Sequence, residues 1–331
     1  MSKRSTFLAV LLAGLVMMCS SWGFLVHRTV NQLAIYELPK PMLTFFYENK
    51  TYLAQNAPRP DQRRSTDPAE GPKHFIDLEM FGDSAAWKMP ENWDDAVKQY
   101  GRDSLLKYGY VPYVVIEQKN KLTEAFRSGN KDSILFYATD LGHYIGDAHV
   151  PLHTTTNYDG QLTNQRGMHD LWETSVPELV FTNLNLYSRH KAKYLSNPSK
   201  AIWQTIRQSH GLLQQMFAVE KDLSKSYTDS TKYRTEFRWG KERRFYSHAF
   251  AQAFYDKLGA SINQQLLHSA DQIADFWYTA WVDAGRPDLS GILSQPWGKQ
   301  LKKQLRKECK TYRKNKLEEK GLLISRQAQE N

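Results

Sequence analysis

Histidine and carboxylate side chains gather in one short stretch of this sequence. Four of the ten histidines fall between positions 143 and 173: His143, His149, His153 and His169. His143 and Asp147 are four residues apart, and His169 and Glu173 repeat that spacing. Residues four apart on a helix share a face, so each pair offers an imidazole nitrogen and a carboxylate oxygen to one divalent cation. A single pair is usually a surface contact, but two pairs with His153 between them predict a metal site suited to zinc.

His149 does not fit the same face. It follows Asp147 by two residues, which places it about 200° around a helix. We therefore expect His149 to be buried, or to orient a ligand, rather than to bind metal.

The elements that must position these residues read as helices, and the sequence predicts an all-α fold. The expected helices are 24–37, 40–55, 93–127, 131–149, 168–190, 198–225, 242–286 and 296–320. A proline- and glycine-rich loop is expected from Ala57 to about Trp93, and a loop that long is usually functional or disordered. Residues 225–244, KSYTDSTKYRTEFRWGKERR, read as a charged connector, and the chain after residue 173 reads as scaffold.

The N-terminus has the order of a secretory signal peptide. Lys3 and Arg4 precede an apolar run from Phe7 to Met18 that is too short to span a bilayer, and small residues follow. Cleavage after Ser21 would leave Trp22 first and export the protein to the periplasm or the medium. A lipoprotein anchored through Cys19 is the rival interpretation, disfavoured by the Met that precedes it.

Charge is distributed unevenly along the chain. We divide it into residues 1–21 as signal peptide, 22–295 as one helical domain, and 296–331 as a basic C-terminal helix and tail. The tail holds eleven Lys and Arg against four Glu, which leaves the body near neutral. The overall formal charge of +9 is therefore weak evidence for nucleic-acid binding. Leu301, Leu305, Cys309 and Tyr312 predict an amphipathic helix with a solvated basic face, and an anionic partner is the alternative.

The order of these motifs resembles the superfamily of zinc-dependent phospholipases C and single-strand-specific zinc nucleases, whose members are helical and bind three zinc ions. The motifs that carry the resemblance are WGFLVH (Trp22 to His27), APRPD (Ala57 to Asp61), HFID (His74 to Asp77), HYIGDAHVPLH (His143 to His153) and MHDLWE (Met168 to Glu173).

Carried over position by position, the resemblance implies three zinc sites. The first would be held by Asp61, His74, His143 and Asp147. The second would be held by His153, His169 and Glu173. The third would be chelated by the amino nitrogen and carbonyl oxygen of Trp22, with His27 and a bridging Asp147. Because that amine must be free, removal of the signal peptide would also create a metal ligand.

The implied reaction is hydrolysis of a phosphodiester, in which dications offset the charge of the phosphate and activate a water. Asp61 is a candidate base, although a metal-bound carboxylate is a poor one. Arg64 stands where the nucleases place an arginine that contacts phosphate, and its alternative reading is a solvated loop charge.

The substrate stays open between a phospholipid head group and single-stranded nucleic acid. His27 stands five positions after Trp22, as in the nucleases. Glu173 as the final ligand and the short interval from His153 to His169 resemble the phospholipases. The near-neutral body makes a phospholipase C-like enzyme the first expectation and a single-strand nuclease the second. An exported zinc-binding protein without turnover is a third, disfavoured because the second zinc would keep an open position.

Overall fold

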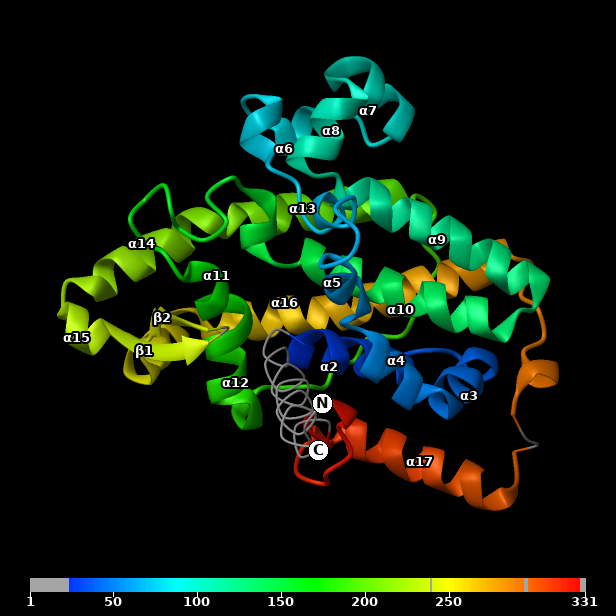
Figure 1. The fold of residues 1–331 in the computed structure, drawn as a ribbon. Coiled ribbons are helices and arrows are strands. Elements are labelled where there is room, and N and C mark those ends of the chain that lie inside the picture. The colour runs from blue at the N-terminus through cyan, green and yellow to red at the C-terminus, as the bar shows by residue number, and fades with distance from the viewer. Residues whose placement is uncertain (1–23, 239, 295–296, 328–331) are drawn as a thin grey trace, which may run out of the picture.

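The computed structural model describes residues 24–238, 240–294 and 297–327, and the chain within them is predominantly helical. The all-α expectation is confirmed. The helices, labelled as in Figure 1, are α2 (Phe24–Ile35), α3 (Lys40–Glu48), α4 (Lys50–Asn56), α5 (Arg59–Arg63), α6 (Ala85–Lys88), α7 (Trp93–Tyr100), α8 (Arg102–Tyr108), α9 (Val111–Ser128), α10 (Lys131–Ala148), α11 (Met168–Asp170), α12 (Val176–Val180), α13 (Pro198–Gly211), α14 (Leu213–Ser224), α15 (Asp229–Lys232), α16 (His248–Asp283), α17 (Lys299–Arg313) and α18 (Ile324–Gln327).

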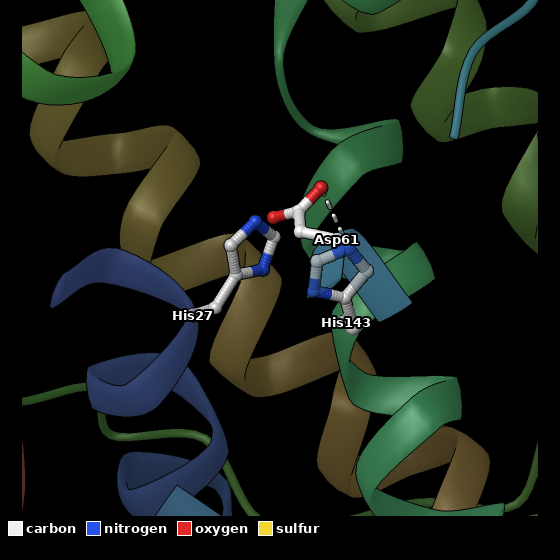
Figure 2. Close-up of side chains that lie close together, drawn as sticks. All are labelled: His27, Asp61 and His143. Atoms are coloured by element: carbon white, nitrogen blue, oxygen red, sulfur yellow. Dashed lines mark ion pairs between the residues drawn. The ribbon is translucent and has the colours of Figure 1, made fainter. Parts of the chain in front are cut away.

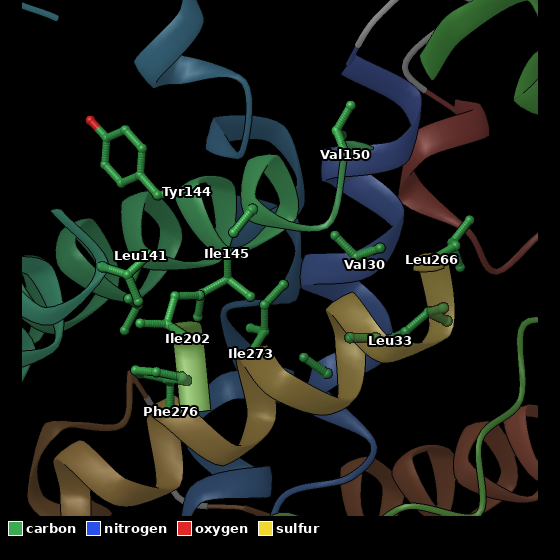
Figure 3. Packing of buried hydrophobic residues seen from close by; sticks show 14 of the residues in the cluster. Val30, Leu33, Leu141, Tyr144, Ile145, Val150, Ile202, Leu266, Ile273 and Phe276 are labelled. Atoms are coloured by element: carbon green, nitrogen blue, oxygen red, sulfur yellow. The ribbon is translucent and has the colours of Figure 1, made fainter. Parts of the chain in front are cut away.

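The core lies where α2, α10, α13 and α16 meet (Figure 3). From Ala138 to Ala148 every residue of α10 is buried, so this helix is enclosed on all sides. The 36-residue helix α16 packs against it and contributes Ile273 and Phe276 to the shared packing. The most enclosed helix of the fold therefore carries the His143–Asp147 pair.

Helices α2 and α10 approach each other closely because glycine occurs twice on their shared face. A Cβ atom at Gly142 would lie 2.2 Å from the Asn31 side chain, and one at Gly146 would lie 2.9 Å from the His27 ring. Gly142 and Gly146 are one helical turn apart. Their missing side chains make room for His27 beside Asp147.

Several expected helices are shorter or broken. The expected helix 93–127 is three helices, because Gly101 and Gly109 adopt φ values of 79° and 85° that favour glycine. The 40–55 pattern breaks at Asn49, and the 198–225 pattern breaks at Leu212. The expected helix 168–190 ends at Val180, followed by a 3₁₀ turn and extended chain.

Residues 225–244 are not a simple connector. They contain most of an antiparallel hairpin formed by β1 (Tyr233–Arg238) and β2 (Lys241–Tyr246), and α16 therefore begins at His248 rather than at 242. The hairpin lies beside α11 and α12 in Figure 1, and β2 contacts the turn at Leu171–Ser175.

The basic helix α17 is held to the domain through a buried carboxylate. Glu308 is 3% exposed and accepts hydrogen bonds from Tyr36 Oη at 2.6 Å, Tyr47 Oη at 2.7 Å and Lys50 Nζ at 2.5 Å. Tyr312 is also buried, so one face of α17 packs inward as the stripe predicts. Among the residues that the structure describes, no helix is long and apolar enough to cross a membrane.

Candidate metal centre

Four ligand-type atoms converge where α5, α10 and the loop before residue 75 meet. His74 Nδ1 lies 2.9 Å from Asp147 Oδ2 and 3.1 Å from His143 Nε2, and the latter two atoms are 3.2 Å apart. Asp61 Oδ1 lies 3.5 Å from His74 Nδ1 and 3.8 Å from His143 Nε2. The Asp61 side chain is 27% exposed, whereas the other three are almost fully buried.

The separations among His74, His143 and Asp147 fit three corners of one tetrahedral site, and Asp61 lies close to both imidazoles. Bonds of about 2.0–2.1 Å from zinc to nitrogen or oxygen place neighbouring ligands of a tetrahedron about 3.3 Å apart. The five pairs above range from 2.9 to 3.8 Å, around that value. The donor set of two imidazoles and two carboxylates is also one that zinc accepts.

The imidazoles are oriented by hydrogen bonds on their far sides. His143 Nδ1 donates to the carbonyl oxygen of Ala57 at 2.9 Å, which leaves its Nε2 facing the other ligands. His153 Nδ1 donates to the carbonyl oxygen of His74 at 2.7 Å and is oriented in the same way. Fixing one ring nitrogen as a donor keeps the other free to bind metal.

A second group forms where the 3₁₀ turn at Pro151–Thr154 meets α11. His153 Nε2 lies 3.2 Å from His169 Nε2, which lies 2.7 Å from Glu173 Oε2. His153 Nε2 and Glu173 Oε2 are 3.7 Å apart. Glu173 stands in a π-helical turn, Leu171–Ser175, a local widening that occurs often at functional sites. With three protein donors, this group leaves a tetrahedral position for another ligand.

His27 connects the two groups. Its Nε2 lies 3.4 Å from Asp147 Oδ1 and 3.6 Å from Glu173 Oε1, which are the oxygens that these carboxylates do not present to their own groups. The ring also stacks on His143 with centroids 4.0 Å apart, and the Asp61 carboxylate faces the edges of both rings in Figure 2. A third cation next to His27 would therefore share both carboxylates with its neighbours.

Electrostatics around the cluster favours ionised carboxylates. Burial alone would raise the pKa of Asp147, but the imidazoles of His143 and His74 hold it well below its ordinary value. Burial alone would lower the pKa of His74, but the charge of Asp147 raises it to about 9. A proton therefore competes with a cation for His74, and metal binding at neutral pH must displace it.

A network behind His74 was missed by the sequence reasoning. Glu70 is 1% exposed and lies 3.7 Å from His74 Nε2, and it accepts hydrogen bonds from Tyr144 Oη and from Arg63 Nη2 at 3.0 Å. Arg63 also pairs with Asp140 at 2.8 Å. The one available signal was Glu70 four residues before His74, because the rest of the network depends on how residues 57–93 fold.

A family model described as S1/P1 Nuclease matches residues 22–277 of the sequence. The chain belongs to the S1/P1 nuclease family. No curated protein matches the sequence significantly. Membership makes the chain a zinc-dependent hydrolase of phosphodiester bonds, and its buried histidine and carboxylate clusters are consistent with metal binding.

The S1/P1 nuclease fold brings together eight of the nine residues expected at the metals: His27, Asp61, His74, His143, Asp147, His153, His169 and Glu173. The ninth, Trp22, lies outside the described residues, as does Cys19. Arg64 is half exposed, with its Nη1 3.5 Å from Asp61 Oδ1.

His149 is absent from the four groups of possible metal ligands found among the described residues. Its Nδ1 donates to the carbonyl oxygen of Ile145 at 2.8 Å, and burial lowers its pKa to about 4. It is therefore a neutral, packed histidine at physiological pH. Glu173 faces His27 as well as His153 and His169, a contact that the sequence did not predict.

Proposed function

We propose that this protein is an exported nuclease that hydrolyses phosphodiester bonds in single-stranded nucleic acid with three zinc ions. The family match supports a nuclease better than the phospholipase C that the sequence analysis placed first. The single observation that carries the proposal is that His27, Asp147 and Glu173 join two ligand groups into one continuous cluster.

In this proposal the ligands divide as the sequence predicts, with one addition. His74, His143 and Asp147 would hold one ion together with Asp61, whose Oδ1 lies within 3.8 Å of both imidazoles, and His153, His169 and Glu173 would hold a second. His27 and Asp147 would hold the third together with Trp22, and the position of Glu173 Oε1 adds that carboxylate. When bound, zinc activates water at neutral pH and offsets the negative charge of a phosphodiester.

Proton transfer and phosphate binding would fall to residues on the solvent-exposed side of the cluster. Asp61 is the most exposed of the first group and is placed to orient a water or accept its proton. Arg64 lies beside it, half exposed, where its guanidinium can grip a phosphate through two parallel hydrogen bonds. The charge of the buried carboxylate Glu70, 3.7 Å from His74 Nε2, would favour a proton on that nitrogen and so leave Nδ1 to face the metal.

A phospholipase C remains a second candidate because Glu173 stands where the nucleases have Asp. The test uses protein with a native Trp22 terminus and measures zinc content by mass spectrometry, together with hydrolysis of single-stranded DNA, single-stranded RNA and phosphatidylcholine vesicles. We expect about three zinc ions per chain and cleavage of the nucleic acids. Hydrolysis of phosphatidylcholine alone would favour the phospholipase, and near-zero zinc would refute both. Full zinc content without turnover would favour a zinc-binding protein.

A further inference from the structure

A cleft lies beside the metal centre, between the loop that precedes His169 and the β1–β2 hairpin. Its volume is about 550 Å³. Its lining is rich in arginine and includes Arg166, Gly167, Asp170, Tyr233, Arg243 and Arg244. None of these residues was expected to contact substrate, and the hairpin was expected to be only a connector.

The cleft is continuous in sequence with the metal centre. Gly167 and Asp170 stand on either side of His169, the ligand-type residue that approaches His153 and Glu173. Asp159, which also lines the cleft, accepts hydrogen bonds from the Gly167 amide at its carbonyl and at Oδ1, each at 3.1 Å. A strand leaving the metal centre past His169 would enter this cleft.

The positive charges of the cleft outnumber the negative ones. Three arginines face two carboxylates, and both carboxylates have hydrogen-bond donors of their own. Asp159 caps the Gly167 turn, and Asp170 accepts from Ser175 Oγ at 2.5 Å. The chemistry that fits such a lining is an anion with several oxygens, because guanidinium groups bind phosphate in a planar, two-point geometry.

The hairpin is fixed through a buried contact to the loop that precedes His169. Tyr246, on β2, donates to Glu220 Oε1 at 2.8 Å and to the carbonyl oxygen of Gln165 at 3.3 Å. Lys232, immediately before β1, pairs with Glu220 at 2.7 Å. A Cβ atom at Gly167 would lie 3.2 Å from the Tyr246 ring, so loop and strand touch here. The arginines on the hairpin are thus held at a set place relative to His169.

The outer part of the hairpin adds a surface suited to unpaired bases. Arg244 lies 4.0 Å above the Tyr233 ring, and its pair with Asp229 is a solvent-exposed contact at 3.4 Å that a phosphate can displace. Phe237 is 75% exposed and shares a strand face with Tyr233. Exposed aromatic rings beside arginine are the usual platform for single-stranded nucleic acid.

We propose that this cleft binds backbone phosphates of single-stranded nucleic acid several nucleotides away from the scissile bond, so that long strands are preferred over short substrates. The inference rests on the proposed nuclease function. Its test compares the double variant Arg243→Gln/Arg244→Gln with Lys302→Gln/Lys303→Gln, which removes the same charge from the exposed face of α17.

Each protein is assayed with a 16-nucleotide oligothymidylate and with bis(p-nitrophenyl) phosphate as a substrate without a strand. We expect the ratio of kcat/KM for the oligonucleotide to that for the small diester to fall roughly tenfold in the arginine variant and to stay unchanged in the lysine variant. For single strands, the logarithm of the binding constant falls with the logarithm of the salt concentration, with a slope of about −0.7 per phosphate contact. Loss of two contacts should therefore lower the slope of log KM against log salt concentration by about 1.4.

Equal ratios in wild type and arginine variant would overturn the proposal. Fluorescence anisotropy with a phosphorothioate 16-mer separates its failure from failure of the proposed function. If the wild type hydrolyses no nucleic acid but binds this probe through Arg243 and Arg244, the cleft stands and the nuclease does not. If the two arginines instead govern only binding to phosphatidylserine vesicles, the cleft serves a lipid surface and the proposal is wrong.

Discussion

Gly146→Ala is expected to separate activity from stability, because the glycine sits against a ligand-type side chain. The added Cβ atom would lie 2.9 Å from His27 Nδ1 and 3.1 Å from its Cε1, where contacts below about 3.4 Å are rare. The His27 ring must therefore move by about 0.5 Å. It cannot move freely, since it is 2% exposed and stacks on His143 at 4.0 Å.

Two terms oppose each other in the folding free energy. Alanine is favoured over glycine inside a helix by about 1 kcal/mol, whereas overpacking a core costs about 1–3 kcal/mol. We expect a net loss of about 0–2 kcal/mol in the free energy of unfolding. Catalytic groups tolerate displacements of about 0.5 Å poorly, so kcat should fall about tenfold and one equivalent of zinc should be lost or weakened.

The assays are urea unfolding, zinc content and hydrolysis of single-stranded DNA. Gly211→Ala is the matched control, because a Cβ atom at Gly211 meets nothing within 4 Å at the end of α13. It should leave kcat and zinc content unchanged. Wild-type kcat and full zinc content in Gly146→Ala would refute the placement of His27 at a metal.

Three further outcomes follow from buried carboxylates. Asp147→Asn should lower zinc content by about two equivalents, because the two oxygens of Asp147 face two ligand groups. His169→Ala should lower zinc content by about one equivalent. Equal losses in the two variants would contradict a role of Asp147 in two metal sites. Burial and the nearby charge of Asp271 raise the pKa of Glu37 from 4.5 to about 10. The native state therefore keeps a proton that the unfolded state loses, and the free energy of unfolding falls as pH rises between these values. In thermal unfolding, Glu37→Gln should be more stable than wild type at pH 9 but not at pH 4.5. Glu308→Ala should lower the free energy of unfolding by about 2–4 kcal/mol because it leaves two buried tyrosine hydroxyls and the partly buried Lys50 ammonium without their acceptor, and an equal loss in an exposed Glu319→Ala control would remove that reason.

The metal ligands could be predicted because local geometry already brings them together. His143 and Asp147 share a helix face by spacing alone, and the same holds for His169 and Glu173. Helix α10, expected at 131–149, spans Lys131–Ala148 because its apolar residues and its Asn130 cap act locally. The resemblance added His27, which no local pattern connects to the cluster.

What failed depended on tertiary contacts or on signals that compete with helix patterns. The break at Gly109 follows from its approach to Phe75, where a Cβ atom would lie 2.3 Å from the carbonyl oxygen. The hairpin did carry a signal, since Tyr233, Thr235 and Phe237 alternate with charged residues before Gly240. The many charged residues of this segment favoured the prediction of a charged connector instead. The burial of Glu308 had no local signal, because burial of a charged residue depends on partners far away in sequence.

The position of His27 is set from three directions, which explains how a short N-terminal helix can serve a metal cluster. Gly142 and Gly146 let α2 approach α10, and the ring then stacks on His143. The opposite side of α2 is fixed by the C-terminal segment, which lies beyond the residues matched by the family model. Gln32 Oε1 accepts a hydrogen bond from the Ile324 amide at 2.9 Å, and Thr29 Oγ1 donates to Ser325 Oγ at 2.9 Å. Because these contacts are buried, displacing the C-terminal segment costs the hydrogen bonds of α2 as well as its own. The geometry of the metal centre therefore depends on both ends of the described chain.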